Sequence, residues 1–239
     1  MTEGERPESL EGRWDILYRD YPELYEEWGR IPKVPDLIEV MVARFPLQGK
    51  VVVDIGSGTG LSTFKMARYA AFVIGIEIEQ AMISMATESA VARGVENVRF
   101  DLGDAEHLPL EDGSVDAALA ITLAGGDVRQ VTTEMERVVR PGGLVLRADV
   151  APGWYGGELG PVISGQPRDE TPAKGSRDDV LAGLGYEAMD VFMDQDYESV
   201  EHVVRTYGFI HSKRVIDYIR EHDVTTIRWK FRARFKTVT

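Results

Sequence analysis

The chain of 239 residues contains no cysteine. This absence excludes disulfide bridges, thiolate metal sites and cysteine nucleophiles. No apolar run approaches the ~18 residues that a membrane-spanning helix needs. The N-terminal stretch MTEGERPESL also lacks the apolar core of a signal peptide. Together these absences predict a cytoplasmic protein without a membrane span.

Basic residues are scarce as well. Lysine and arginine number 27 against 40 aspartates and glutamates, which gives a formal net charge of −13. A broad nucleic-acid footprint requires a basic face, so this excess of acid argues against a nucleic-acid partner. The absence of cysteine and of clustered histidines argues against a metal site, and we expect none, although acidic side chains alone could hold magnesium. A hydrophobic content of 44% and a charged content of 28% are those of an ordinary soluble globular protein.

Regular alternation of strand and helix patterns dominates residues 51–150. Short apolar runs, typical of buried strands, are separated by longer segments in which apolar residues recur at helical spacing. The expected strands are 51–55, 72–78, 98–104, 115–121 and 144–150, and the expected helices are 61–70, 79–94 and 127–140. Strands that alternate with helices form a parallel sheet covered on both faces.

The segments outside the alternating strands and helices of residues 51–150 resemble lids and insertions that cover the main domain. Residues 1–34 are rich in aromatic side chains and broken by prolines, and they predict a small N-terminal helical lid on a main domain at 35–239. Residues 198–222 show two further helical patterns and predict a helical insertion within that domain. Residues 151–176 hold six glycines and four prolines, a composition typical of a lid, a binding loop or disorder.

The C-terminal stretch TTIRWKFRARFKTV alternates basic with apolar residues. A period of two predicts a strand with one charged and one apolar face. Its expected partner is the strand at 186–197, where Asp190, Asp194 and Asp196 share one face. Opposite charges across neighbouring strands stabilise a pair by ~0.2–1 kcal/mol each. We therefore interpret the basic row as structural rather than as a nucleic-acid site.

The stretch VVVDIGSGTG at 51–60 places three glycines, separated by small residues, directly after a buried strand. A glycine-rich turn that opens a helix lets a ligand contact the backbone. A P-loop needs lysine and a hydroxyl after its last glycine, but Gly60 is followed by Leu61 and Ser62. A dinucleotide site needs a third glycine where Leu61 stands, which weakens that interpretation. The third ligand class is S-adenosylmethionine, which offers a carboxylate, a ribose diol and an adenine.

Acidic residues at the ends of the next two strands favour this third class. Glu77 ends the second strand, where an acid can accept hydrogen bonds from both ribose hydroxyls. Asp104 and Ala105 follow the third strand, where a carboxylate and a backbone amide suit the edge of an adenine. The carboxyl ends of successive strands are the edge at which open α/β sheets bind ligands.

Four motifs, in this order and spacing, resemble those of class I S-adenosylmethionine-dependent methyltransferases: VVVDIGSGTG, VIGIEIE, GDAEHLPLEDGSVDAALA and RVVRPGGLVL. The nearest likeness is to the type 11 branch, which includes ubiquinone and menaquinone methyltransferase-like proteins. The resemblance covers roughly 35–150. It implies an α/β, Rossmann-like, doubly wound sheet of seven strands with the last strand antiparallel, S-adenosylmethionine as cofactor and S-adenosylhomocysteine as product. By resemblance, the cofactor site comprises Asp54, Gly56, Gly58, Gly60, Glu77, Ile78, Asp104, Ala105 and Ile121.

Methyl transfer from a sulfonium requires alignment of donor and acceptor and exclusion of water, and it requires a base only where the acceptor loses a proton. The candidates for a catalytic role are Tyr18 and His211, and those for the acceptor pocket are Tyr21, Trp154 and Tyr155. The acidic composition and the cover segments favour a small-molecule acceptor, in a monomer or homodimer. A protein or peptide methyltransferase stays open, as does a non-catalytic S-adenosylmethionine-binding module, because the loop ITLAGG at 121–126 lacks catalytic polar side chains.

Overall fold

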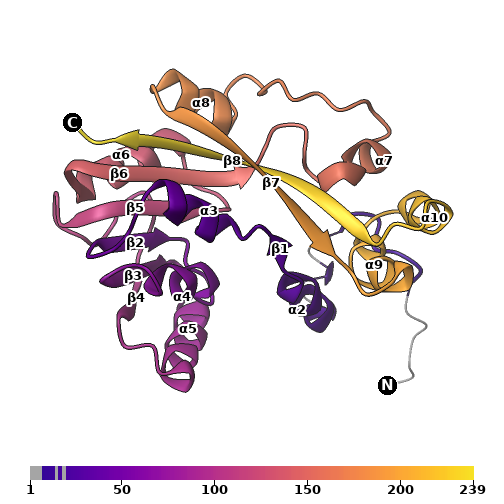
Figure 1. The fold of residues 1–239 in the computed structure, drawn as a ribbon, viewed down its shortest axis with the longest axis horizontal. Helices are drawn as coiled ribbons and strands as arrows, with labels where there is room; N and C mark the ends of the chain where they lie inside the picture. Colours follow the sequence, from indigo (N-terminus) through magenta and orange to yellow (C-terminus); the bar gives the residue numbers. More distant parts are fainter. Residues whose placement is uncertain (1–6, 14–15, 18–19) are drawn as a thin grey trace. The chain divides into compact units, whose positions relative to one another are not determined.

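A computed structural model describes residues 7–13, 16–17 and 20–239 of the chain. The fold divides into two compact units (Figure 1). The first unit takes the chain up to Leu37 together with Gly153–Glu170 and Phe192–Lys230, and the second takes Ile38–Pro152, Thr171–Val191 and Phe231–Thr239. None of the helices in the described part has the length and apolar character needed to cross a membrane.

The second unit contains the predicted parallel sheet. Its strands are β2 (Val51–Ile55), β3 (Phe72–Glu77), β4 (Val98–Leu102), β5 (Val115–Ile121) and β6 (Val139–Val150). All the pairings among these strands are parallel: β3 with β4, β2 with β3, β2 with β5, and β5 with β6. The central residues of β2, β3 and β5 are buried, as expected for continuous apolar runs, whereas β4 at the edge of the sheet has only half-buried and exposed residues.

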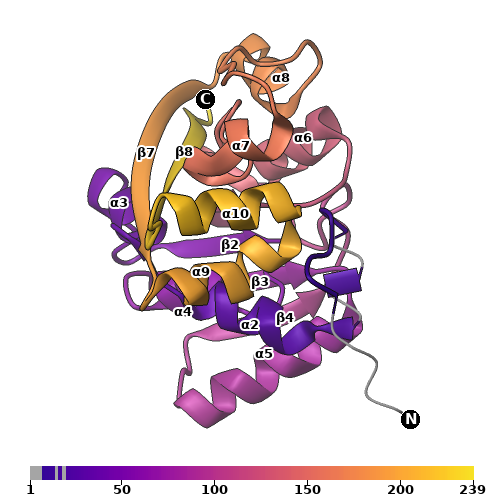
Figure 2. The same cartoon turned by 90° about the vertical axis from the view of Figure 1, so that its right-hand side faces the viewer.

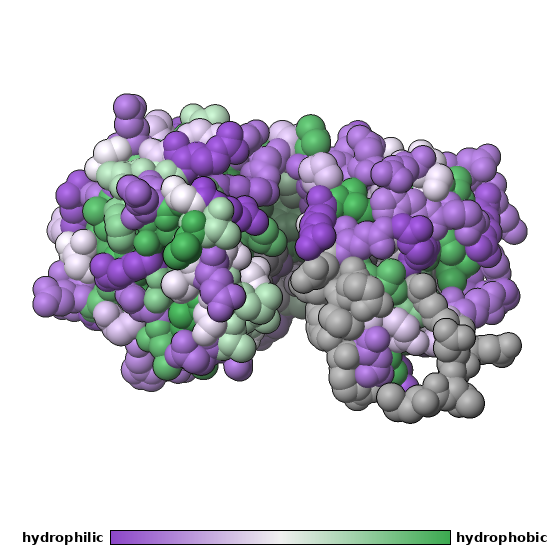
Figure 3. Space-filling view, turned by 90° about the horizontal axis from the view of Figure 1, so that it is seen from below, coloured by the Kyte–Doolittle hydropathy of each residue, from purple (hydrophilic) through white to green (hydrophobic). Residues whose placement is uncertain are grey.

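Helices cover both faces of these strands. They are α3 (Leu37–Arg44), α4 (Leu61–Ala67), α5 (Gln80–Arg93), α6 (Val128–Val138) and α8 (Arg177–Gly183). On β5, Ala118 belongs to the core cluster beneath α6, whereas Leu119 lines a small space with Met41 of α3. Alternate residues of β5 therefore point to opposite faces of the sheet and belong to two separate apolar layers. Figure 3 shows apolar side chains interspersed with hydrophilic ones on one face of the molecule. On α5, the apolar side chains of Met82 and Val91 are exposed.

Within the described part of the chain the sheet has eight strands, in the order β1-β7-β8-β6-β5-β2-β3-β4, so the predicted count of seven is wrong. The additional strand is β1 (Lys33–Val34), which pairs antiparallel with Gln195 and Asp194 of β7 (Glu187–Asp196). Two residues between prolines show no periodicity, so the sequence pattern gave no signal for it. The predicted antiparallel last strand is confirmed, because β8 (Thr226–Thr237) runs antiparallel to β6.

The predicted charge pairs between the last two long strands are largely confirmed. Arg232 Nε lies 2.6 Å from Asp190 Oδ1 in the second unit. Arg228 Nε lies 2.7 Å from Asp194 Oδ1 in the first unit. Asp196 instead accepts a hydrogen bond from the hydroxyl of Thr226 at 2.7 Å. The basic row of β8 is thus used within the fold.

The first unit is mainly helical (Figure 2). Its described elements include α2 (Pro22–Arg30), η1 (Gly157–Leu159), α7 (Gly160–Ser164), α9 (Val200–Thr206), η2 (Gly208–Ile210) and α10 (Lys213–Glu221). Leu10, Leu17 and Leu24 pack against Phe209 and Ile210 in one apolar cluster. Helices occupy the stretch predicted to be a helical insertion, and the glycine- and proline-rich stretch 151–176 contains two short helical turns.

Candidate cofactor site

The glycine turn between β2 and α4 has three residues in the left-handed region. Their φ angles are 72° at Gly56, 54° at Gly58 and 86° at Gly60. The room for a side chain differs between these glycines. A Cβ on Gly56 would lie 2.5 Å from Leu123 Cδ1, whereas a Cβ on Gly58 would have no neighbour within 4 Å. The left-handed φ favours glycine at position 56, where a Cβ would also displace the Leu123 methyl group, and Gly58 presents an open backbone to its surroundings.

Most amides of this turn already have acceptors. The N–H groups of Gly56 and Ser57 donate to the Ile76 carbonyl at 2.8 and 3.1 Å. The Gly58 N–H donates to Glu77 Oε2 at 2.9 Å, and the Gly60 N–H donates to the Ser57 carbonyl at 2.9 Å. A phosphate group binds such turns through free amides. Here these four amides are occupied, and a carboxylate stands beside them.

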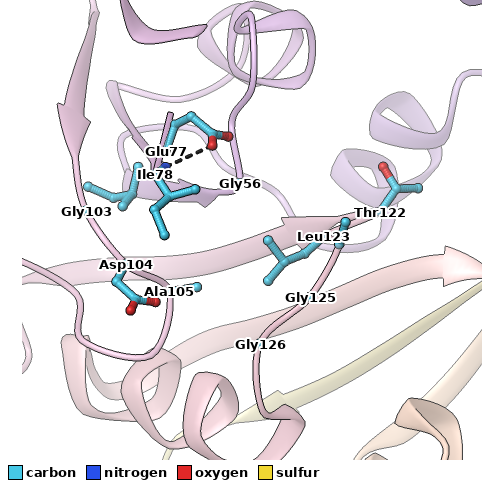
Figure 4. A pocket seen from close by; sticks show the side chains of 12 residues that line it. Gly56, Glu77, Ile78, Gly103, Asp104, Ala105, Thr122, Leu123, Gly125 and Gly126 are labelled. Carbon is cyan, nitrogen blue, oxygen red and sulfur yellow. Dashed lines mark hydrogen bonds between the residues drawn. The ribbon is translucent and has the colours of Figure 1, made fainter. Parts of the chain in front are cut away.

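Glu77 is fixed by three backbone amides at the end of β3. Besides the bond from Gly58, its Oε1 accepts from the N–H groups of Ile78 at 2.8 Å and Glu79 at 3.1 Å. Figure 4 shows the Ile78 bond at the edge of the pocket. An ionised carboxylate has about four lone-pair sites, of which three are used here, two on Oε1 and one on Oε2. The carboxylate is therefore preorganised, and Oε2 keeps one site for a further donor, such as a ribose hydroxyl.

Asp54 plays a structural part beneath the turn. It is 1% exposed, and its Oδ2 accepts a 2.6 Å hydrogen bond from the hydroxyl of Thr63 in the first turn of α4. Burial raises the pKa of Asp54 to about 6, the Thr63 bond opposes this rise, and the charge of Glu77 adds to it. Asp54 thus ties β2 to α4.

A cavity of about 380 Å³ lies at the carboxyl ends of β2, β3, β4 and β5 (Figure 4). This volume lies within the range of small-molecule sites. Its lining residues are Gly56, Ile76, Glu77, Ile78, Gly103, Asp104, Ala105, Thr122, Leu123, Ala124, Gly125 and Gly126. Asp104 Oδ1 accepts from the Glu106 N–H at 2.9 Å, which orients its carboxylate.

The structure brings together five of the nine residues expected at the cofactor: Gly56, Glu77, Ile78, Asp104 and Ala105. The other four, Asp54, Gly58, Gly60 and Ile121, do not line the cavity. Asp54 and Gly60 instead support the turn, because a Cβ on Gly60 would lie 2.9 Å from Phe100 Cζ and Phe64 Cε2. Sequence reasoning placed the loop after β5 beside the site but selected Ile121, whereas the following residues, Thr122 onward, form the lining. In the sequence, the change from the apolar run of β5 to glycines was the signal that could have identified these lining residues.

The two residues proposed for catalysis are Tyr18 and His211, and of these the structure describes His211, which does not line the cavity. Tyr18 lies outside the described residues. His211 belongs to the first unit, is 7% exposed, and contacts the ring of Tyr207 edge-on with centroids 4.7 Å apart. Burial lowers the pKa of His211 to about 4, so its imidazole is neutral at neutral pH. A catalytic role for either residue stays a prediction.

The three aromatic residues predicted at the acceptor also belong to the first unit. Tyr21 packs edge-on against Phe209 with ring centroids 5.2 Å apart. Trp154 donates its Nε1–H to Glu170 Oε1 at 2.9 Å, and the Arg168 guanidinium lies 3.7 Å from its ring centroid.

These contacts give Trp154 a role in anchoring its own loop. Its ring also meets Phe192 of β7 edge-on, at a centroid distance of 5.6 Å. Tyr155 is 69% exposed. The assignment of Tyr21, Trp154 and Tyr155 to an acceptor stays a prediction.

Comparison with known proteins agrees with this geometry. A family model described as a methyltransferase domain matches residues 47–176, more than half of the chain. The arsenite methyltransferase of Halobacterium salinarum is 36% identical over 107 residues, which are 43% of this chain and 27% of that protein. The ubiquinone biosynthesis O-methyltransferase of Sinorhizobium fredii is 35% identical over 127 residues, 52% of this chain and 47% of that protein.

The uncharacterised methyltransferase YcgJ of Bacillus subtilis is similar in sequence and in fold. It is 37% identical over 100 residues, 41% of this chain and 40% of that protein. Its crystal structure superimposes with a TM-score of 0.57 at 20% identity, covering 83% of this chain and 95% of that chain. The sequence matches span less than half the length of these curated relatives. The family match, which includes the glycine turn, Glu77 at the end of β3 and Asp104 after β4, shows that the chain belongs to the class I S-adenosylmethionine-dependent methyltransferases.

Proposed function

We propose that this protein transfers a methyl group from S-adenosylmethionine to a small-molecule acceptor by in-line displacement. The observation that carries the proposal is the chemistry of the cavity in the second unit. Its charged lining residues are two carboxylates, Glu77 and Asp104, and the turn beside it has Gly56, Ser57, Gly58 and Gly60 already hydrogen-bonded. A ligand with hydroxyl and amino donors fits this surface, whereas the phosphates of a dinucleotide would meet negative charge.

We assign separate parts of the cavity to separate parts of the cofactor. Glu77 would accept from a ribose hydroxyl, Asp104 from the adenine amino group, and the apolar side chains of Ile78 and Leu123 would cover ring and chain carbons. When bound, S-adenosylmethionine supplies a methyl group on a good leaving group. Among the residues that the structure describes, no histidine, lysine or tyrosine lines the cavity. The residues that line it therefore act by alignment and by exclusion of water rather than by proton transfer.

The small-molecule acceptor rests on the relatives and on charge. The names of two relatives specify arsenite and ubiquinone biosynthesis, both of which concern small molecules. The net charge of −13 disfavours a polyanionic acceptor. We keep a cytoplasmic location and a monomeric or dimeric state as predictions alongside this function.

A thermal-shift series tests the cofactor. We expect S-adenosylmethionine and S-adenosylhomocysteine to raise the melting temperature, because a ligand at ~100 times its Kd adds ~2.7 kcal/mol of stability. NAD and ATP at equal concentration should leave the midpoint unchanged. A shift with NAD alone would contradict the proposal. Formation of S-adenosylhomocysteine in the presence of arsenite, catechols or quinols then tests transfer, and binding without turnover on such a panel would favour a non-catalytic module.

A further inference from the structure

Strand β4 leaves one edge of the sheet open. Within the described part of the chain it is the last strand, and β3 is its one neighbour (Figure 1). The Asn97 carbonyl and the Gly103 N–H each bond to backbone groups of β3 at 3.0 Å. Backbone groups alternate in direction along a strand, so the N–H and C=O groups that face the open edge are those of Val98, Phe100 and Leu102. Such a row is a template for pairing with another strand.

The same strand carries one charge of each sign. Arg99 and Asp101 share a face of β4, and Arg99 Nε lies 2.8 Å from Asp101 Oδ2. Their side chains are 50% and 36% exposed, so both can reach a neighbouring strand. Charges on an edge strand usually prevent pairing, because like charges opposite each other are destabilising.

The order of residues in β4, VRFDL, makes the strand complementary to itself. When two copies run antiparallel with Phe100 opposite Phe100, Arg99 of each copy stands opposite Asp101 of the other. Val98 then stands opposite Leu102, so apolar residues also meet. A shift of the register by two residues would place Arg99 opposite Arg99, or Asp101 opposite Asp101. The charges therefore select one register.

The direction of the backbone groups agrees with this register. Phe100 faces the open edge, so the two copies of Phe100 can exchange both of their N–H···O=C bonds. Arg99 and Asp101 then occupy the positions without hydrogen bonds, where opposite Cα atoms come within about 4.5 Å and side chains are closest. Cross-strand ion pairs are favoured at these positions.

A hollow of about 500 Å³ lies beside the open edge, between α5 and β4. Its apolar lining is formed by Ala90, Val91, Val95, Val98 and Phe100. Val91 is 80% exposed. Antiparallel pairing about a two-fold axis keeps the same face of the sheet uppermost in both copies. The hollows of the two copies would thus adjoin, and the exposed Val91 side chains would gain apolar neighbours.

We propose that two copies of this chain form a homodimer through β4, antiparallel about Phe100, with Arg99 of each copy paired with Asp101 of the other. The interface uses one patch on both copies, as two-fold symmetry requires. Its residues belong to the second unit. This inference goes beyond the proposed function and does not depend on it.

Reversal of single charges tests the pairing. We expect the ligand-free wild-type protein to be a dimer at micromolar concentration in sedimentation equilibrium. Arg99→Asp sets acid against acid, and Asp101→Arg sets base against base, so each variant alone should weaken the dimer by about tenfold or more. An equal mixture of the two variants should form dimers again, because every cross-strand pair then joins opposite charges.

The mixture is a sharp test, because the ion pair within each chain stays broken in both variants. Recovery of the dimer therefore reports contacts between copies. Lys174→Asp is the matched control, since it reverses an exposed charge in the loop before α8 and should leave the dimer unchanged.

Leu102→Pro tests the backbone bonds. The Leu102 N–H faces the open edge, so proline removes a donor to the second copy and leaves the bonds to β3 in place. We expect this variant to be a monomer that still unfolds cooperatively on heating. Leu102→Ala keeps the N–H and should remain a dimer.

Three results would overturn the inference. They are a wild-type protein that stays monomeric as its concentration rises, a dimer that survives both charge reversals, and an equal mixture of the two variants that stays monomeric. If the protein dimerised as expected but bound neither S-adenosylmethionine nor S-adenosylhomocysteine, the proposed function would fail and the dimer would stand.

Discussion

At the scale of single residues, Glu77 joins the glycine turn to the cavity. One oxygen accepts from Gly58 on the turn, and the other accepts from the first amides after β3. Aspartate is one methylene shorter than glutamate, so an aspartate at this position would not reach the Gly58 amide from the same backbone. The longer side chain therefore does two things: it faces the cavity and it restrains the turn.

Substitution of Glu77 separates these two roles. Glu77→Ala removes a charged acceptor, worth ~1.5–3 kcal/mol, and should weaken S-adenosylmethionine binding at least tenfold. Glu77→Asp keeps the charge but loses the Gly58 bond, so its Kd should lie between the wild-type and alanine values. Titration calorimetry measures both, with the exposed Glu79→Ala as control. If Glu77→Ala bound S-adenosylmethionine with wild-type affinity, the assignment of Glu77 to the ribose of the cofactor would be wrong.

At the scale of elements, one carboxylate fastens α8 to β8. Asp178 accepts from Arg234 Nε at 2.7 Å and Nη2 at 2.8 Å, and from Arg232 Nη1 at 3.1 Å. The side chains of Asp178 and Arg234 are only 12% and 13% exposed. The pair of Arg228 with Asp194 is more open, at 56% and 36%. Burial, rather than the number of ion pairs, decides which of them stabilises the fold.

Asp178→Ala should therefore be strongly destabilising. It leaves two largely buried guanidinium groups without their shared carboxylate, at a cost of about 2–3 kcal/mol and a fall in melting temperature of about 5–10 °C. Asp194→Ala is the matched control and should change little, because its pair is exposed. Scanning calorimetry of both variants checks this. Equal, small shifts would show that water reaches Asp178 more freely than its burial implies.

At the scale of the whole molecule, lowering the pH changes the stability contributed by Asp54 in the second unit and by His211 in the first unit in opposite directions. In the second unit, burial, with a smaller contribution from Glu77 and against the Thr63 bond, raises the pKa of Asp54 from 3.8 to about 6. A raised pKa contributes stability that is present below 3.8 and is lost as the pH rises through about 6. In the first unit, burial lowers the pKa of His211 from 6.5 to about 4, so its contribution is present above 6.5 and is lost as the pH falls through about 4.

Between about pH 7.5 and about pH 5, these two groups should stabilise the second unit and destabilise the first. Hydrogen exchange, corrected for intrinsic rates, should show slower exchange in β2 and α4 and faster exchange in α9 and α10 at the lower pH. Asp54→Asn should abolish the first change and His211→Gln the second. A parallel change in both units, unaffected by either variant, would contradict the assignment.

The sequence by itself determined the strands and helices of residues 51–150, the glycine turn, and the acids after β3 and β4. These features are local: apolar periodicity, a glycine run and an acid at a strand end can be read within about ten residues. Family resemblance follows from the same local motifs. Five of the nine expected cofactor residues line the cavity for this reason.

The tertiary structure alone decided the remaining features. The two-residue strand β1 exists only because β7 offers it a partner. Leu123 reaches Gly56 across a chain separation that no local pattern encodes. Thr122 resembles any exposed threonine until its left-handed φ of 52° is known. Such features depend on long-range packing and on strain that the whole fold maintains, so they appear only once the elements are assembled.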